Sequence, residues 1–301
     1  MTHGPLDDDA IESYRTAGAV LAEAVTEARS MVEPGRRQLA VAEWVEDFVR
    51  ESDAGLAFPV NLSVDAEASH ATPARDDETE FGEEMVCLDV GVHVDGYIAD
   101  AAVTVDHTDT PELVEAAEMA LEAAVDEAGP GVEVGVVGQA IEDVIRGYGY
   151  TPVLNLSGHG VERYDAHTGP TVPNRGVERS VELAPGQAVA IEPFATDGRG
   201  KVGEGTDEEI YEFEQSRSVR DRRARETLEA IEAFDDLPFA ARWLDGDRVT
   251  MSLRRLKQAN AIKGYPVLKE ADGALVSQAE HTLLITDDGV EVTTAGIHSF
   301  D

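Results

Sequence analysis

The sequence has a single cysteine and lacks any long apolar run. Cys87 is the only cysteine among 301 residues, so no disulfide can form within the chain. Its predicted place in a strand indicates a buried, inert thiol rather than a nucleophile. No stretch approaches the roughly 18 uncharged apolar residues of a membrane-spanning helix. The N-terminal residues have neither the basic start nor the apolar core of a secretory signal, so we expect a soluble, cytoplasmic protein.

Positive charge is also scarce. The 24 lysines and arginines stand against 61 acidic residues, which gives a formal net charge of −37. A surface this acidic repels the phosphates of nucleic acids and anionic membranes, so we expect neither as a direct partner. Repulsion between copies also favours a monomer. Lysine occurs at four positions only: Lys201, Lys257, Lys263 and Lys269.

Hydrophobic periodicity predicts an α+β protein. Helices are expected over 11–32, 36–50, 110–128 and near 136–145, and strands at 85–94, 97–105, 188–195, 280–286 and 290–294. Helices precede and separate hairpins, which favours antiparallel sheets in two successive helix-then-strand halves. Residues 205–268 differ in character, because 217–234 is charge-rich and helical and 238–268 has helix-like apolar spacing without strand alternation until Tyr265-Pro266. We predict one catalytic domain over 1–301 with an inserted helical subdomain at 205–268 that packs on it.

Asp89 and Asp100 flank a predicted hairpin turn. Apolar residues alternate around Asp95-Gly96, a dipeptide typical of a two-residue type I′ turn. That turn pairs Gly91 with Asp100 and Asp89 with Ala102, so the two carboxylates become diagonal neighbours, with Cα atoms about 7–8 Å apart. Like charges inside a sheet need a cation, and a pair of divalent metals would supply one. The alternative is a pair of solvated surface acids.

Three short blocks add the other ligand types of a metal site. His159 lies in NLSGHG, Glu192 in AIEPF and Glu280 in SQAEH. Each alone could be ordinary, since a single histidine is usually a core residue and a strand-end glutamate is usually solvated. With Asp89 and Asp100 they form a set of one histidine and four carboxylates. Such a set suits Mn, Fe, Co or Zn at a hydrolytic dinuclear centre.

Five segments resemble those of type 2 methionine aminopeptidases of the archaeal kind. They are FPVNLSVDAEASHATP (58–73), LDVGVHVDGYIAD (88–100), NLSGHGVERYDAH (155–167), IEPFATDGRG (191–200) and SQAEHT (277–282). The resemblance runs from about residue 10 to the C-terminus. It implies a pita-bread fold with two pseudo-symmetric halves. The 88 positions from Glu192 to Glu280 leave room for the helical, winged-helix-like insertion that marks type 2 enzymes.

The resemblance also implies a reaction and a role for each ligand. The chain would remove the N-terminal methionine of nascent polypeptides with two divalent metal ions, Co, Mn, Fe or Zn. Asp100 and Glu280 would bridge both ions, Asp89 would chelate one, and His159 and Glu192 would complete the other. Glu192 would also carry a proton from water to the leaving amine. An enzyme of nascent chains works near the ribosome, which makes the ribosome a candidate partner.

Two histidines and an apolar pocket complete the implied site. His70 and His167 would hydrogen-bond the scissile amide and stabilise the tetrahedral oxyanion. Ile210 would make one wall of the pocket purely apolar, which suits a thioether. The residues expected to line the methionine pocket are Phe58, Ala166, Ile210 and Tyr265.

Two other functions are compatible with these motifs. A prolidase or aminopeptidase P shares the fold and the metal ligands, but its substrates have proline second and it usually carries a long N-terminal domain, which this sequence does not show. A non-catalytic pita-bread binding protein would keep the fold and lose the ligands. All five ligands are present here, which favours an enzyme.

The charge of −37 predicts a protein adapted to multimolar salt, where the Debye length falls to about 3 Å or less and self-repulsion becomes tolerable. We expect the folded state to be lost on dilution into low salt. Thermal melts in low and in multimolar KCl measure this directly. Equal melting temperatures in the two conditions would contradict the hypothesis.

Overall fold

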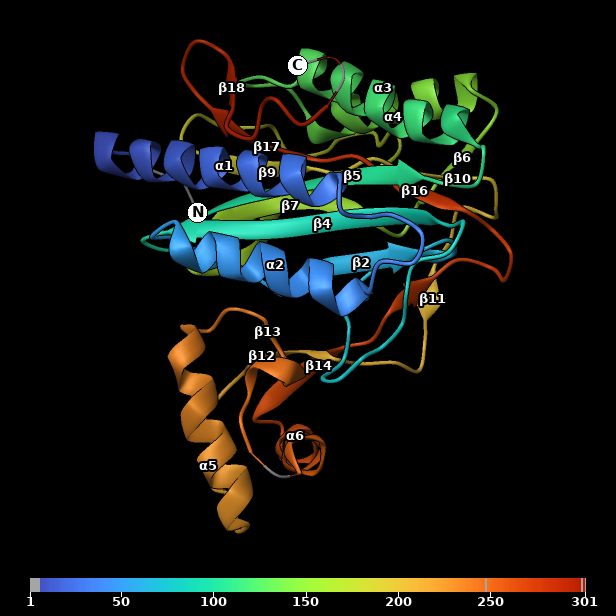
Figure 1. Ribbon diagram of the computed structural model, residues 1–301. Helices are drawn as coiled ribbons and strands as arrows, with labels where there is room; N and C mark the ends of the chain where they lie inside the picture. The colour runs from blue at the N-terminus through green and yellow to red at the C-terminus, as the bar shows by residue number, and fades with distance from the viewer. Residues whose placement is uncertain (1–5, 247, 299, 301) are drawn as a thin grey trace.

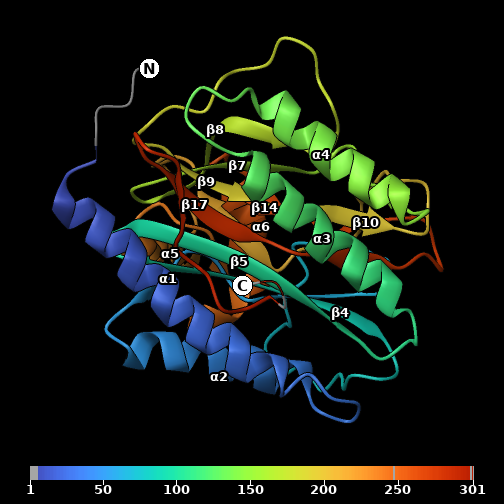
Figure 2. The same ribbon diagram turned by 90° about the horizontal axis from the view of Figure 1, so that it is seen from above.

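Four helices cover the sheets of the main body in two pairs. The computed structural model describes residues 6–246, 248–298 and 300. The helices are α1 (Asp8–Arg29), α2 (Gln38–Glu51), α3 (Pro111–Glu127) and α4 (Val134–Gly147). Seen from above, α1 and α2 lie on one side of the sheets and α3 and α4 on the other (Figure 2). Among the described residues, no helix combines the length and apolarity needed to cross a membrane.

The helices begin and end within a few residues of their predicted bounds. α1 begins after Asp7, whose carboxylate accepts a hydrogen bond of 2.8 Å from the Ala10 N–H and so caps the first turn. It ends at Arg29 rather than residue 32, because the Ser30 hydroxyl donates to the Glu27 carbonyl at 2.7 Å and satisfies an end carbonyl of the last turn. Local hydrogen bonds therefore determine where the helix begins and ends, while the apolar periodicity predicts that the segment is helical.

Each helix pair packs on a core of its own. The first core lies between α1, α2 and the hairpin formed by β4 (Met85–Val94) and β5 (Tyr97–Asp106). The second lies between α3, α4 and the strands of the other half, and it includes Leu121, Ile141 and Leu283. Two helix-plus-sheet halves face each other, which confirms the predicted α+β architecture of two halves.

The hairpin has the register that the sequence predicts. β4 and β5 are antiparallel, with Gly91 opposite Asp100 and Asp89 opposite Ala102. Asp95 and Gly96 have φ values of 53° and 87°, as a type I′ turn requires. At Gly91 an added Cβ would lie 2.2 Å from the ring of Phe58, so only glycine lets that ring lie against the strand beside Asp100.

Two strands of the second half break at an acidic residue. The predicted strand 188–195 is interrupted: β9 (Ala188–Ile191) and β10 (Phe194–Thr196) belong to different sheets, with Glu192-Pro193 between them. Proline has no N–H to continue a ladder. The predicted strand 280–286 is likewise preceded by a break, since Ala279-Glu280 separates β16 (Val276–Gln278) from β17 (His281–Ile285). The two breaks are adjacent, because Phe194 pairs with Gln278 and Ile191 pairs with His281.

The remaining strands are short and complete five sheets. One sheet has the order β18-β17-β9-β7-β8, and in another β1 and β2 both pair with β4. β10 lies between β16 and β6, and β15 lies between β11 and β3. Their bounds are β1 (Gly55–Leu56), β2 (Asn61–Val64), β3 (Glu67–Ser69), β6 (Thr151–Pro152), β7 (Ser157–Glu162), β8 (Asp165–Pro173), β11 (Gly203–Glu204), β15 (Leu268–Lys269) and β18 (Val290–Val292).

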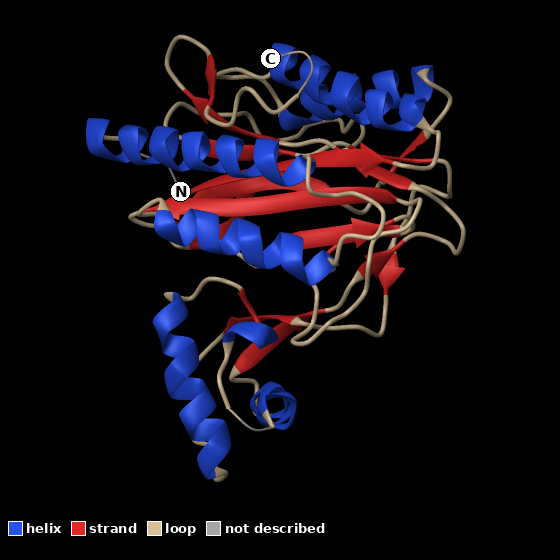
Figure 3. Cartoon of the chain, in the orientation of Figure 1, coloured by secondary structure: helices blue, strands red, loops and turns tan. Residues whose placement is uncertain are grey.

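Residues 205–268 form a mixed subdomain rather than a helical one. It contains α5 (Arg222–Ile231), α6 (Val249–Gln258) and a sheet of β13 (Phe239–Ala240), β12 (Ile210–Phe213) and β14 (Ile262–Tyr265). The expectation of no strand before Tyr265-Pro266 is wrong, because strands of two to four residues are too short to show alternation in the sequence. This inserted subdomain lies below the main body in Figures 1 and 3, around a small core of its own.

A buried ion pair joins the inserted subdomain to the main body. Arg242 pairs with Glu46 of α2, and the indole N–H of Trp243 donates to the same carboxylate at 2.7 Å. The Arg242 guanidinium also donates to the Thr72 hydroxyl at 2.7 Å and the Pro73 carbonyl at 2.9 Å. Breaking such a pair would leave an uncompensated buried charge. The loop after β3 is thus tied to both parts of the molecule.

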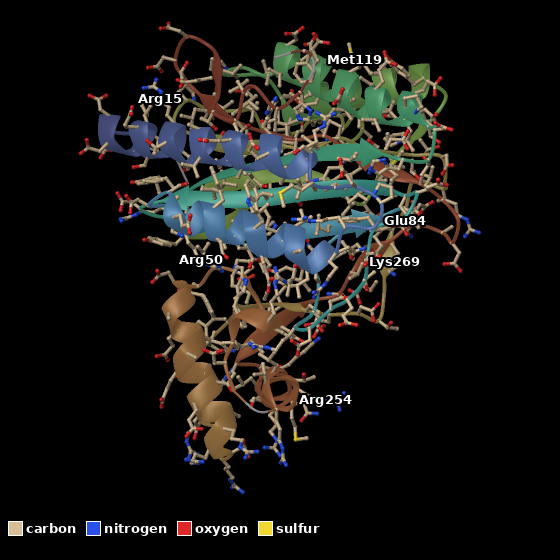
Figure 4. All side chains as sticks on the ribbon, viewed as in Figure 1. Arg15, Arg50, Glu84, Met119, Arg254 and Lys269 are labelled. Atoms are coloured by element: carbon tan, nitrogen blue, oxygen red, sulfur yellow. The ribbon has the colours of Figure 1, made fainter. Side chains whose placement is uncertain are left out.

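Basic residues concentrate in the inserted subdomain. Residues 205–268 hold eleven lysines and arginines against thirteen acidic residues, a formal charge of −2, which leaves −35 on the rest of the chain. Arg222, Arg223, Arg248 and Arg255 border one cavity at the ends of α5 and α6. Arg254 extends from α6 toward solvent (Figure 4). The net charge of the whole sequence therefore does not show that its basic residues are unevenly distributed.

Candidate metal centre

All five predicted ligands line a single cavity of about 360 Å³. They come from the hairpin of the first half, from β7, and from the two strand breaks of the second half. The predicted histidines His70 and His167 border the same cavity. The ligands are Asp89, Asp100, His159, Glu192 and Glu280.

The two hairpin aspartates are held with unsatisfied oxygens. Thr282 of β17 fixes the backbone of Asp100, because its hydroxyl accepts from the Asp100 N–H and donates to the Asp100 carbonyl, both at 2.8 Å. The Oδ1 atoms of Asp89 and Asp100 are buried and have no hydrogen-bond partner. Burial raises the pKa of Asp89 to about 7. Burial and then the nearby Asp89 charge raise the pKa of Asp100 well above its usual value.

His159 presents a free nitrogen to the carboxylates. Its Nδ1 lies 3.2 Å from the Gly160 carbonyl, which can only accept, so Nδ1 carries the proton. Nε2 then has its lone pair free, 3.8 Å from Asp100 Oδ2 and 3.9 Å from Glu192 Oε1. Burial lowers the pKa of His159 to about 3, so the ring is neutral at physiological pH. A neutral imidazole with a free nitrogen is the form that binds metals.

The two glutamates share a residue that the sequence interpretation did not single out. Gln278 donates through Nε2 to Glu280 Oε2 at 3.2 Å and lies 3.4 Å from Glu192 Oε2. Glu280 Oε1 is buried without a partner. Burial, reinforced by neighbouring carboxylates, raises the pKa of both glutamates well above the usual value. Gln278 lies within the SQAEHT motif, so the sequence points to this segment but does not predict that Gln278 contacts both glutamates.

These residues fit a divalent cation. Burying ionised carboxylates without a partner is costly, and Asp89, Asp100 and Glu280 each contribute an orphaned oxygen. One donor atom from each of Asp100, His159 and Glu280 lies within 4.8 Å of the other two. Oxygen donors with one imidazole suit a first-row divalent metal. The arrangement can therefore hold metal and activate water for hydrolysis.

The two further histidines come from different segments that border the cavity. His70 follows β3 with φ of 64°, and its Nδ1 lies 3.3 Å from the Pro266 carbonyl. Burial lowers the pKa of His70 to about 4. His167 lies in β8 with an exposed side chain, and its ring centroid is 4.6 Å from that of His159. Tyr265 packs edge-on against His70 at 5.1 Å and so connects the histidines to the inserted subdomain.

Three of the four residues predicted for the methionine pocket border the cavity. These are Phe58, Ile210 and Tyr265. Ala166 does not border it, but lies in a buried cluster that also contains Phe58. The reason is the alternation of β8, which directs neighbouring side chains to opposite faces, so that His167 borders the cavity and Ala166 does not. Lining residues without a sequence signal are Pro238, Lys263 and Leu268.

Comparison with known proteins agrees with this site. Residues 12–245 match "Metallopeptidase family M24". Methionine aminopeptidase of Archaeoglobus fulgidus is 47% identical, covering 96% of this chain and 100% of the relative, and that of Methanocaldococcus jannaschii is 44% identical, covering 94% and 99%. The crystal structure of methionine aminopeptidase from Thermotoga maritima superposes with a TM-score of 0.71 at 25% identity, covering 98% of this chain and 100% of that one. The predicted pita-bread fold is thereby confirmed.

Without metal, Asp89 should destabilise the folded protein as the pH rises from about 6.5 to 8.5. Its pKa is about 7 when folded and 3.8 when unfolded, so at this residue the unfolded state binds fewer protons, and the contribution of Asp89 to the free energy of unfolding falls by about 1 kcal/mol. The buried histidines act in the opposite direction near pH 6.5, because unfolded histidines still bind protons there while His70 and His159 do not, so the effect of Asp89 is measured as a difference between two variants.

Thermal melts of chelator-treated protein at the two pH values, with and without MnCl₂, test this. We expect the melting temperature of the metal-free wild type to fall by a few degrees relative to that of Asp89→Asn between the two pH values, and Mn²⁺ to stabilise the wild type at the higher pH. An identical pH dependence of the two metal-free proteins would show that Asp89 does not titrate as described.

Proposed function

The chain belongs to metallopeptidase family M24, and from that membership we infer that it is a methionyl aminopeptidase, which removes the N-terminal methionine by hydrolysing the first peptide bond. The observation that carries this conclusion is the convergence of five ligands on one cavity in a chain that matches methionine aminopeptidases over nearly its full length. An Xaa-Pro peptidase or a non-catalytic binding protein is not favoured.

We propose that two divalent ions, Co, Mn, Fe or Zn, occupy the site. Asp100, His159 and Glu280 have donor atoms close enough for one ion, and Glu192 Oε1 lies 3.9 Å from the same His159 nitrogen. Asp89 lies outside this group and leaves a carboxylate for a second ion. Asp100 and Glu280 would be shared. A divalent ion bound there lowers the pKa of a coordinated water toward neutrality and polarises the carbonyl of the substrate.

Glu192 is the residue placed to move a proton. Its carboxylate lies in the cavity at a strand break, held from one side by Gln278 Nε2 at 3.4 Å. Burial raises its pKa, so it can accept a proton from the attacking water and pass it to the leaving amine.

The hydrogen bond of His70 supports different roles for the two histidines. Since Nδ1–H faces the Pro266 carbonyl, a neutral His70 keeps Nε2 as an acceptor. His70 would therefore accept the N–H of the scissile amide and could not donate to the oxyanion. Among the described residues, no side chain forms a hydrogen bond with the ring nitrogens of His167. His167 would therefore donate the hydrogen bond to the oxyanion. Phe58, Ile210 and Tyr265 would hold the methionine side chain.

We further propose that the enzyme acts in the cytoplasm as a monomer, on chains emerging from the ribosome, and in high salt. The acidic composition supports the salt requirement and the monomer, because self-repulsion falls only when charges are screened. The reaction itself supports the link to nascent chains.

Hydrolysis of Met-Ala-Ser and of Xaa-Pro peptides separates the candidate reactions. We expect release of free methionine from the first and no turnover of the second, in high KCl with Mn²⁺ or Co²⁺. Asp100→Asn, which keeps the shape but not the charge of a shared ligand, should be inactive. Preferential cleavage of Xaa-Pro peptides would assign the chain to the other peptidase class.

His70→Ala should lower kcat on the order of 10²-fold while metal content stays near that of the wild type. The reason is that His70 contacts the substrate amide and no metal ligand. Metal analysis of purified variants is the measurement, with Glu280→Gln as the control that should lose metal. Loss of metal in His70→Ala would make His70 part of the metal site.

A further inference from the structure

One wall of the catalytic cavity comes from the inserted subdomain and changes character along its strands. β12 and β14 pair Ile210 with Tyr265 and Glu212 with Lys263. Alternate residues of a strand share a face, so these four side chains lie on one face of the sheet. Ile210, Lys263 and Tyr265 border the cavity. Ile210 is buried and Lys263 exposed, so the wall runs from an apolar interior to a charged mouth.

Lys263 is the only lysine or arginine among the described residues that border the cavity. Its Nζ lies 3.0 Å from the Tyr265 hydroxyl and 4.2 Å from the centre of the Tyr265 ring. Tyr265 in turn donates its hydroxyl hydrogen to Glu212. No salt bridge within 4.0 Å joins Lys263 to a carboxylate among the described residues, whereas Lys257 and Lys269 are both paired. Its ammonium is therefore positioned by Tyr265 and available to a ligand.

The residues around Lys263 favour an interaction between its ammonium group and a negatively charged substrate. Tyr265, which holds Lys263, packs against His70, the residue that faces the scissile amide. After burial, which is the main cause, the positive charge of Lys263 also helps to lower the pKa of His70 to about 4. The rest of the chain carries a strongly negative charge. An acidic peptide is repelled by that surface, and a single cation at the mouth offsets the repulsion where the peptide must pass.

We propose that Lys263 is a specificity residue, which binds a carboxylate of the substrate beyond its second residue. The enzyme then prefers methionyl peptides with an acidic residue shortly after the cleavage site, or short peptides with a free C-terminal carboxylate. This inference rests on the proposed peptidase function and deepens it.

The test compares kcat/KM for peptides that differ in one charge. Met-Ala-Ser-Glu-amide against Met-Ala-Ser-Gln-amide probes the side chain, and Met-Ala-Ser against its C-terminal amide probes the terminal carboxylate. We expect the wild type to prefer the anionic member of at least one pair by roughly two- to five-fold, the range for an exposed ion pair. The preference should shrink as KCl is raised from the lowest concentration at which the protein stays folded.

Variants assign the preference to one side chain. Lys263→Met should abolish it, Lys263→Arg should keep it, and Lys201→Met, at an exposed lysine outside the cavity, should leave it unchanged. Equal kcat/KM within both pairs in the wild type, or a preference that survives in Lys263→Met, would overturn the role of Lys263 while the peptidase function stands. Absence of hydrolysis of every peptide would overturn the proposed function and this inference with it.

Discussion

The confinement of four carboxylates in one buried cavity is the constraint on which the rest of the structure depends. Like charges that converge away from water destabilise a fold unless protons or cations neutralise them. Here one buried oxygen of each of Asp89, Asp100 and Glu280 has no hydrogen-bond partner. The protein's own groups therefore compensate the buried negative charge only in part. Gln278 and Thr282 fix the positions of the acids without neutralising them. Protons can neutralise such a site without metal, but a bound metal stabilises it while leaving the carboxylates ionised, which ties stability to the chemistry.

The two halves meet this constraint by different local devices. The first half uses an uninterrupted hairpin, whose register places Asp89 and Asp100 on one face. The second half uses paired breaks in neighbouring strands, so that Glu192 and Glu280 sit where the chain leaves one sheet for another. A residue at a break has no ladder partner, and its side chain can turn into the cavity. The inserted subdomain then covers the open side, held by the buried pair of Glu46 and Arg242.

Sequence reasoning reached the parts of this arrangement that depend on local chemistry. The turn at Asp95-Gly96 predicts the observed register of the hairpin. The side-chain types in the short motifs point to five metal-binding residues, and all five border one cavity. It failed where tertiary context decides. Strands of two to four residues in the inserted subdomain show no period, so a sheet was predicted as helix. Ala166 and His167 are neighbours in sequence, yet only the pleat of β8 determines which of them borders the cavity.

Average composition also misleads about the surface. A chain with a formal charge of −37 nevertheless gathers eleven of its basic residues in the inserted subdomain. This separation gives the molecule an electric dipole whose nearly neutral end is the subdomain. In multimolar salt the field of that dipole extends only about 3 Å from the surface, so it acts on groups that are almost in contact. The wall that carries Tyr265 belongs to the nearly neutral end, so a negatively charged chain end meets the least repulsion on the side where this wall lies.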